Sequence, residues 1–371
     1  MMFVLEKRPA PSRLAAFLAP LIAILLTVLC GLALIWAIGK SPVEALEVYF
    51  LYPISDLRAV LAAPPDQWSG LLYRPAEVLV KAVPLMLIGA GLAVCFRAGQ
   101  FNIGAAGQYT LGAIAAGAVA LHAPPDTPRI LLLPALLVAG IAGGALWAFI
   151  PAILKIKARA NEILTSLMLT YVAALLLDWL VRSPWRDPRG FGFPQTPDFP
   201  EGALMPVLLE GTRLHWGAVI AVVCVIALWL LMRGETGYRV TVTGLAPRAA
   251  RFAGYEEAGT IARVFLLSGA LAGLAGAIEA SATIGQLQPE ISADYGFAAI
   301  IVAFLGRLSP LGAVFAALVL ALTYIGGENA QIEMGLPRNA SAVFQGMLLF
   351  FILACDAVIH YRLRRRRRRP A

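Results

Sequence analysis

Charged residues are scarce in this chain of 371 residues: they make up 14% of it, whereas apolar residues make up 60%. A soluble domain needs more charge to cover its surface, so the composition excludes an ordinary soluble protein. Histidine occurs only three times, and no two copies have the spacing of a metalloprotease site. The four cysteines are isolated, mostly in or beside apolar runs, and show neither disulfide nor metal-site spacing.

Motifs of catalysis and nucleotide binding are also missing. Residues 39–41 read GKS, like the end of a phosphate-binding loop, but the required first glycine is replaced by Leu34 inside an apolar run. The chain has no G-x-S-x-G motif either. We therefore expect no enzyme, no metal or cofactor bound by this chain, and no ATPase site of its own. If ATP drives its activity, another polypeptide must hydrolyse that ATP.

Long apolar runs dominate what is present. A helix that crosses the hydrocarbon core needs about 20 apolar residues at ~1.5 Å each. The first run is too long for a cleaved signal peptide, so we expect it to be retained. The sequence predicts an all-α, polytopic membrane protein with about ten transmembrane helices in one domain, 1–371. The expected spans are 14–39, 78–96, 101–121, 130–153, 162–181, 214–232, 261–283, 297–305, 310–326 and 341–360.

The positive charge is concentrated at the C-terminus. The net charge of +8 falls to +1 without the seven arginines of the last ten residues. A basic tail at 361–371 after a last apolar run indicates a cytoplasmic topology anchor that can touch anionic lipid, rather than a nucleic-acid site. With both termini inside, 20 of the 30 Lys and Arg residues lie on the cytoplasmic side, which favours that orientation.

Two weakly similar halves are visible, about 78–181 and 261–360, each with a glycine-interrupted segment near its second span. In the second half the apolar run 297–305 has only nine residues, and nine helical residues cover only ~14 Å. Paired short or broken segments in two halves are typical of a transporter's central site. We therefore expect broken helices at the centre of the fold.

The stretch FNIGAAGQ, residues 101–108, is the sharpest of these interruptions. It puts two amides, Asn102 and Gln108, where an apolar run should continue. Gly104 and Gly107 would let the backbone turn, and amides can both donate and accept hydrogen bonds. We expect the helix to break here, with the amides beside the path of a polar, uncharged solute. Structural capping of the broken helix is the alternative.

Glu279 is the strongest single candidate for a charged site residue. It lies fifteen residues after Val264, hence ~22 Å along its helix. An ionised carboxylate at the bilayer centre costs at least ~2.5 kcal/mol unless it faces a cavity or a partner. We therefore place it on the same solute pathway. Alternatively, the helix ends earlier and Glu279 lies in the outer interface.

Small residues recur at helical spacing in two of the expected spans. The pairs are Gly140 with Gly144, and Gly269 with Gly273. Such patterns let two membrane helices approach closely. We interpret them as packing contacts.

The strings FNIGAAGQ, NEILTSLMLTYVA at 161–173 and SGALAGLAGAIE at 268–279 resemble the membrane permeases of bacterial ABC importers for nucleosides and simple sugars. The resemblance extends over nearly the whole chain and is greatest to the nucleoside-type permeases. Two positions depart from their usual pattern: Ala106 stands where those permeases usually have Glu, and Thr170 where they have Asn. Both departures bear on which solute is moved.

The segment 233–263 contains small apolar residues of its own, and a short helix at the membrane face would suit Pro247 in its first turn and Gly254 at its end. The segment is similar to the coupling segment of the same permeases. The resemblance implies that a short helix bearing small residues fits a cleft on a cytoplasmic ATPase and transmits its movement. The implied coupling residues are Gly237, Arg239, Gly244, Ala249, Ala250 and Gly254.

The resemblance implies a permease subunit of an ATP-driven importer in the bacterial inner membrane, moving nucleosides or related simple sugars by alternating access. It implies three partners: a cytoplasmic ABC ATPase, a second related permease, and a periplasmic or lipoprotein substrate-binding protein. A branched-chain amino acid permease is the alternative within ABC importers. An ion-coupled secondary transporter is the alternative from another class, but buried carboxylates beyond Glu279 are scarce. An intramembrane enzyme is the least favoured, for want of a nucleophile and a base.

Overall fold

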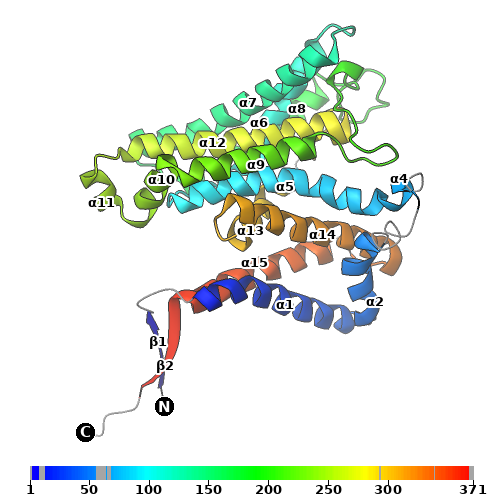
Figure 1. Ribbon diagram of the computed structural model, residues 1–371. Coiled ribbons are helices and arrows are strands. Elements are labelled where there is room, and N and C mark those ends of the chain that lie inside the picture. Colours follow the sequence, from blue (N-terminus) through cyan, green and yellow to red (C-terminus); the bar gives the residue numbers. More distant parts are fainter. Residues whose placement is uncertain are drawn as a thin grey trace. The chain divides into compact units, whose positions relative to one another are not determined.

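The computed structural model describes residues 2–7, 13–55, 64, 68–291, 294–337 and 339–366, which are almost wholly helical (Figure 1). Every expected span corresponds to a helix, so the all-α prediction is confirmed. The ten helices are α1 Arg13–Ala37, α5 Tyr73–Arg97, α6 Ala105–His122, α7 Arg129–Ala158, α8 Glu162–Arg182, α9 Gly217–Arg233, α12 Glu257–Ile278, α13 Tyr295–Leu305, α14 Pro310–Met334 and α15 Asn339–His360.

Six of the spans found among the described residues are long and apolar enough to cross a membrane. A seventh is possible if α9 and the helix after it, which are bent by 72°, form one span. Helix α13 has only eleven residues, as the short apolar run predicts. Large apolar side chains such as Leu146 and Leu175 are 67% and 70% exposed, which suits helices surrounded by lipid.

Helix ends differ from the ends of the apolar runs for two reasons. Helix α5 begins five residues before its run, and α14 continues eight residues beyond its own. Helix α6, by contrast, begins at Ala105 rather than at 101. Apolar composition marks the part of a helix inside the hydrocarbon core, whereas hydrogen bonding lets the helix continue past it. The late start of α6 has a different cause, which is the break described below.

Residues 54–321 form one compact unit, in which α12 packs on α5, α6 and α7. A Cβ added at Gly144 would lie 2.6 Å from the Cα of Gly273 and would meet the carbonyl oxygen of Gly269. One added at Gly140 would lie 3.0 Å from the carbonyl oxygen of Gly273. The two small-residue patterns therefore face each other across α7 and α12, which confirms the predicted packing contact.

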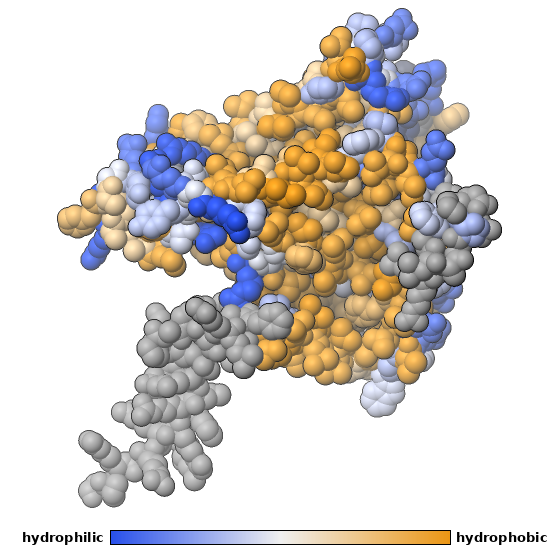
Figure 2. Space-filling view, in the orientation of Figure 1, coloured by the Kyte–Doolittle hydropathy of each residue, from blue (hydrophilic) through white to orange (hydrophobic). Residues whose placement is uncertain are grey.

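The segment after α9 contains two helices where one was expected. Helix α10 covers Glu235–Leu245, and α11 covers Pro247–Phe252 with Pro247 at its first position. Ala246 separates them with φ −145° and ψ 70°, because the residue before a proline is disfavoured in the helical region. Gly254 follows α11 with φ +79°, as expected for a helix end. Figure 2 shows hydrophilic side chains gathered at this end, beside the apolar surface of the neighbouring helices.

Residues 1–53 and 322–371 form the other compact unit, in which α1 packs on α15. Tyr49 stacks on Phe344 with ring centroids 5.0 Å apart. Strand β1, Met2–Lys7, pairs antiparallel with β2, Tyr361–Arg366. The expected basic tail thus begins as a strand, and its residues 367–371 lie outside the described part. The remaining short elements of the chain are α2 Pro42–Leu46, a π-helix at Glu47–Leu51, 3-10 helices at Tyr52–Ile54 and Glu201–Ala203, α4 Trp68–Leu71, and a π-helix at Glu279–Ile284.

Candidate functional site

The helix breaks at the predicted place, between α5 and α6. Residues 98–104 are not helical, and Gly99 has φ +70°, which few side chains tolerate. Gly104 and Gly107 serve a different purpose, because both lie against α8. A Cβ at Gly104 would lie 2.7 Å from the carbonyl oxygen of Ser166, and one at Gly107 would lie 2.8 Å from the Cα of Thr170. The turn therefore depends on Gly99, and the two predicted glycines allow the close approach of α8.

Asn102 and Gln108 are buried and bonded to each other across the start of α6. Asn102 Nδ2 donates to Gln108 Oε1 at 2.9 Å, and Gln108 Nε2 donates to Asn102 Oδ1 at 2.9 Å. Asn102 also accepts from the Gly104 backbone N–H at 3.0 Å and donates to Ser268 Oγ of α12 at 3.2 Å. The amide of Asn102 is thus fully used in holding the break. A role for either amide on the solute path stays a prediction.

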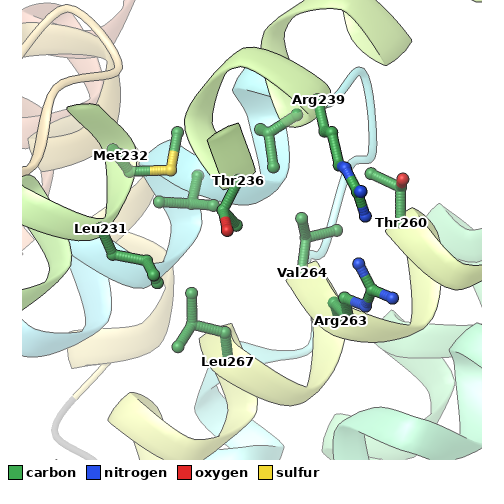
Figure 3. Close-up of a pocket in the computed structure, with 10 residues that line it drawn as sticks. Leu231, Met232, Thr236, Arg239, Thr260, Arg263, Val264 and Leu267 are labelled. Carbon is green, nitrogen blue, oxygen red and sulfur yellow. The ribbon is translucent and has the colours of Figure 1, made fainter. Parts of the chain in front are cut away.

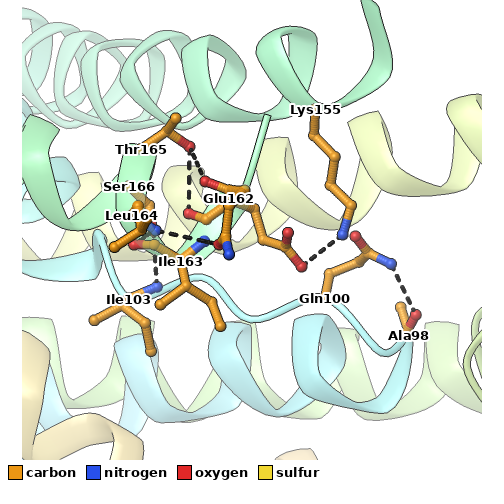
Figure 4. Close-up of polar contacts among 10 residues, drawn as sticks. Ala98, Gln100, Ile103, Lys155, Glu162, Ile163, Leu164, Thr165 and Ser166 are labelled. Carbon is orange, nitrogen blue, oxygen red and sulfur yellow. Dashed lines mark hydrogen bonds and ion pairs between the residues drawn. The ribbon is translucent and has the colours of Figure 1, made fainter. Parts of the chain in front are cut away.

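Helix α8 closes the other side of the break (Figure 4). The backbone N–H of Ile103 donates to Ser166 Oγ at 3.1 Å, and Gln100 Nε2 donates to the carbonyl oxygen of Ala98 at 3.3 Å. Near the start of α8, Glu162 forms an ion pair with Lys155 of α7. Side chains of α6, α8 and α12 therefore hold one non-helical segment, as buried backbone in a membrane requires.

A second break separates α12 from α13, and the helices that follow the two breaks meet. A Cβ added at Gly296 of α13 would lie 2.5 Å from the Cβ of Ala106 in α6. The rings of Tyr109 and Tyr295 pack edge to face with centroids 6.2 Å apart. Tyr109 also donates to the carbonyl oxygen of Ile291 at 3.3 Å. Gly296 therefore allows α13 to pack closely on Ala106, which is buried.

Glu279 is buried, with 6% of its surface exposed, at the start of the π-helix after α12. It lies 22 residues after Glu257, so about 33 Å along the span, near the end opposite α10. The carboxylate of Glu279 interacts electrostatically with Lys81 of α5 and with Arg213. Glu279 thus has basic neighbours, which a carboxylate at this depth needs. Its contact with a solute remains a prediction.

Arg213 and His215, in the loop before α9, did not stand out in the sequence. Arg213 Nη1 contacts Glu77 Oε2 of α5 at 3.3 Å, and its Nη2 donates to the carbonyl oxygen of Thr283 at 3.4 Å. His215 is 2% exposed, and its Nδ1 accepts from the Gly217 backbone N–H at 3.1 Å. Burial lowers the pKa of His215 to about 4, and the Arg213 charge adds to this effect. Their position at the start of an apolar run, with Arg213 just before the expected span 214–232 and His215 just inside it, was the only available signal.

The predicted coupling residues fall into two groups. Gly237 lies against the Met232 carbonyl, Gly244 lies against the backbone of residues 97–99, and Ala250 is 2% exposed. These three pack within the chain, which accounts for their small size, and a role for them in coupling stays a prediction. Ala249 and Gly254 are exposed.

Arg239 is the one charged member of the predicted coupling set. It forms an ion pair with Glu235, whose Oε1 lies 2.6 Å from Arg239 Nη2. Its guanidinium also lies 5.1 Å from the centroid of the Tyr255 ring. Arg239 therefore ties α10 to the start of the segment that leads into α12.

A charged hollow of about 620 Å³ lies near the connection of α7 to α8. Its lining includes Lys155 and Arg159 on one side and Glu257 of α12 on the other. Asn161 caps α8 beside it by accepting from the Ile163 backbone N–H at 2.9 Å. This polar surface is suited to contact with another protein rather than with lipid.

Residues 74–353 match the family model described as "Branched-chain amino acid transport system / permease component". The chain is 34% identical to the glucose ABC transporter permease protein TsgB13 of Haloferax volcanii, covering 96% of this chain and 92% of that protein. It is 29% identical to the guanosine ABC transporter permease protein NupP of Bacillus subtilis, covering 94% and 96%. It is also 29% identical to the nucleoside ABC transporter permease protein NupB of Lactococcus lactis, covering 90% of each. The chain therefore belongs to the branched-chain amino acid transport system permease family, and it is a multi-pass membrane permease subunit of an ABC transporter.

Proposed function

We propose that this permease moves neutral, hydroxyl-rich solutes, namely nucleosides or simple sugars, into the cell by alternating access. The observation that carries the proposal is its similarity, over nearly the full length, to relatives named for glucose, guanosine and nucleosides. These solutes share a ring with several hydroxyl groups and no net charge. Amides and hydroxyls that donate and accept suit such a ligand.

In this proposal, the solute path runs beside the two helix breaks. Glu279 offers acceptors to ribose or sugar hydroxyls, and Tyr109 and Tyr295 offer ring faces and hydroxyls nearby. Coulombic interaction between Tyr109 and Glu279 supports their placement in one polar region. Asn102 and Gln108 hold the first break, and they meet solute only when the transporter changes state and their mutual bonds open.

ATP enters the cycle through a partner in this proposal, because a cytoplasmic ABC ATPase hydrolyses it and this chain binds no cofactor. The exposed Ala249 and Gly254 of the α10–α11 segment meet that ATPase, and the charged hollow near α8 supports a second contact. A related permease completes the pathway, and a substrate-binding protein delivers solute from outside. Both termini lie in the cytoplasm, as the distribution of Lys and Arg favours.

Uptake into proteoliposomes tests the proposal. Vesicles that hold this chain with the related permease, the ATPase and internal ATP, and that have the substrate-binding protein outside, should take up labelled guanosine or glucose, while vesicles with this chain alone should not. A protonophore should leave uptake unchanged, and removal of ATP should abolish it. Uptake driven by an ion gradient in vesicles that hold this chain alone would overturn the proposal. Uptake of labelled leucine in preference to both solutes would overturn the substrate class.

A further inference from the structure

A cavity of about 230 Å³ lies where α5, α9, α10 and α12 meet (Figure 3). Its walls are mainly apolar and include Leu231 and Met232 of α9, and Val264 and Leu267 of α12. Figure 3 shows the guanidinium groups of Arg239 and Arg263 close together at one side of this cavity, with Leu231 and Leu267 at the other. The cavity is therefore amphipathic, with positive charge at one end and hydrocarbon at the other.

The cationic end of this cavity is only partly neutralised within the described part of the chain. Arg239 is bonded to Glu235, but Arg263 is exposed and forms no ion pair with any described residue. Two like charges that point toward one another repel, so a ligand that places an anion between them is favoured. Guanidinium groups bind phosphate oxygens in a bidentate manner.

The cavity lies at the level of the membrane interface. Arg233, which ends α9, stacks over the ring of Trp229 at 3.6 Å. Paired tryptophan and arginine at the end of an apolar helix mark the headgroup region. Leu231 precedes Arg233 by two residues near the end of α9, and Leu267 follows Arg263 by one turn of α12, so each leucine lies deeper in the bilayer than the arginine of its own helix. The apolar wall therefore faces the acyl region, and the arginines lie toward the headgroups. Leu231 is 44% exposed, which leaves that wall open to lipid.

We propose that this cavity binds the phosphate of an anionic phospholipid between Arg239 and Arg263, with an acyl chain against Leu231 and Leu267. The bound lipid bridges α10 and α12, which are joined in sequence only through α11. Charge complementarity and interfacial depth favour a lipid over a free phosphate, because a free phosphate would leave the apolar wall without a ligand. The inference does not depend on which solute the permease moves.

Native mass spectrometry of the full chain in detergent tests this site, with dioleoyl phosphatidylglycerol as the probe and dioleoyl phosphatidylcholine as the neutral comparison. Arg263→Gln should weaken binding of phosphatidylglycerol about fivefold, which corresponds to ~1 kcal/mol for one arginine near anionic lipid. Arg251→Gln, which removes an exposed arginine of α11 outside the cavity, is the matched control and should change binding little. Binding of phosphatidylcholine should be the same in all three proteins.

Two outcomes would overturn the site. Equal losses of phosphatidylglycerol in Arg263→Gln and Arg251→Gln would show that only general surface charge attracts the lipid. Displacement of phosphatidylglycerol by millimolar inorganic phosphate would show a free-anion site with no role for the apolar wall. Because Arg263 is exposed, its replacement should leave folding intact, and an unchanged melting temperature verifies this in the same samples.

Discussion

Replacement of Asn102 by leucine should destabilise the permease through the groups it leaves behind. The side chain makes four hydrogen bonds, to Gly104, to Ser268 and two with Gln108. The bond to Ser268 joins the break to α12, and bonds between helices in membrane proteins average about 0.6 kcal/mol. The same value for each of the three local bonds gives ~2–3 kcal/mol for the four together. The larger values known from soluble proteins do not apply, because unfolded segments in the bilayer also find polar partners.

A second replacement separates this mechanism from a role in binding solute. Asn102→Leu leaves the Gln108 amide buried without a partner, whereas the double variant Asn102→Leu with Gln108→Leu removes both halves of the pair. The double variant should therefore lose less unfolding free energy than the sum of the two single losses, by ~1 kcal/mol or more. Gln100→Leu is the matched control, since it removes from the same break a buried amide whose Nε2 donates only locally, to the carbonyl oxygen of Ala98.

Thermal unfolding in detergent and uptake in vesicles should be measured on the same preparations. We expect the apparent melting temperature of Asn102→Leu to fall by several degrees, more than that of Gln100→Leu, and to recover in part in the double variant. Additive losses would refute the reciprocal amide pair. An Asn102→Leu protein that melts like the parent but transports at least tenfold more slowly would place the amide on the solute path instead.

Three further outcomes follow from the packing and the charges. Gly144→Leu should separate α7 from α12, at a cost of about 1–3 kcal/mol in unfolding free energy. The amount of folded membrane protein, measured by size-exclusion chromatography, should fall, while the control Leu146→Phe, on the exposed side of α7, should be neutral. Ala249→Trp should leave the permease folded but reduce its co-purification with the ATPase, whereas Gly244→Trp should fail to fold because its side chain meets the chain's own backbone; the opposite pattern would contradict this placement. The melting temperature should fall as pH drops from 6.5 toward 4, because the unfolded chain takes up a proton at His215 near pH 6.5 and the folded chain resists it until about pH 4. His215→Phe should flatten this pH dependence, and an unchanged slope would refute the assignment.

Much of the fold was predictable because apolar runs report directly on membrane helices. The ten helices, the break at 101–108 and the use of the two glycine pairs as packing contacts follow from run length and glycine spacing alone, whereas the pairing of α7 with α12 does not. The direction of side chains was not predictable in this way. The contact of Gly244 with residues 97–99 had no signal in the sequence, because which face of a short helix is buried depends on neighbours far away in sequence.

The candidate site was predictable by residue type but not by partner. A polar residue in an apolar run needs a hydrogen-bond or charge partner in the folded protein, and Asn102, Gln108 and Glu279 were found for that reason. Some of their partners come from distant parts of the chain: Ser268 of α12 for Asn102, and Lys81 of α5 with Arg213 of the loop before α9 around Glu279. No spacing rule links residues 166 positions apart, so the bond from Asn102 to Ser268 emerges only from the three-dimensional arrangement.

The pairing of β1 with β2 constrains the topology of the whole chain. Their ladder joins Met2 to Arg366 and Lys7 to Tyr361, so backbone from the two ends shares hydrogen bonds. Two strands can form such a ladder only within one aqueous compartment, because the hydrocarbon core separates the two sides of a bilayer. The number of complete crossings between residues 7 and 361 must therefore be even. Ten crossings satisfy this parity, seven do not, and any segment that enters the membrane and returns on the same side must be counted as no crossing.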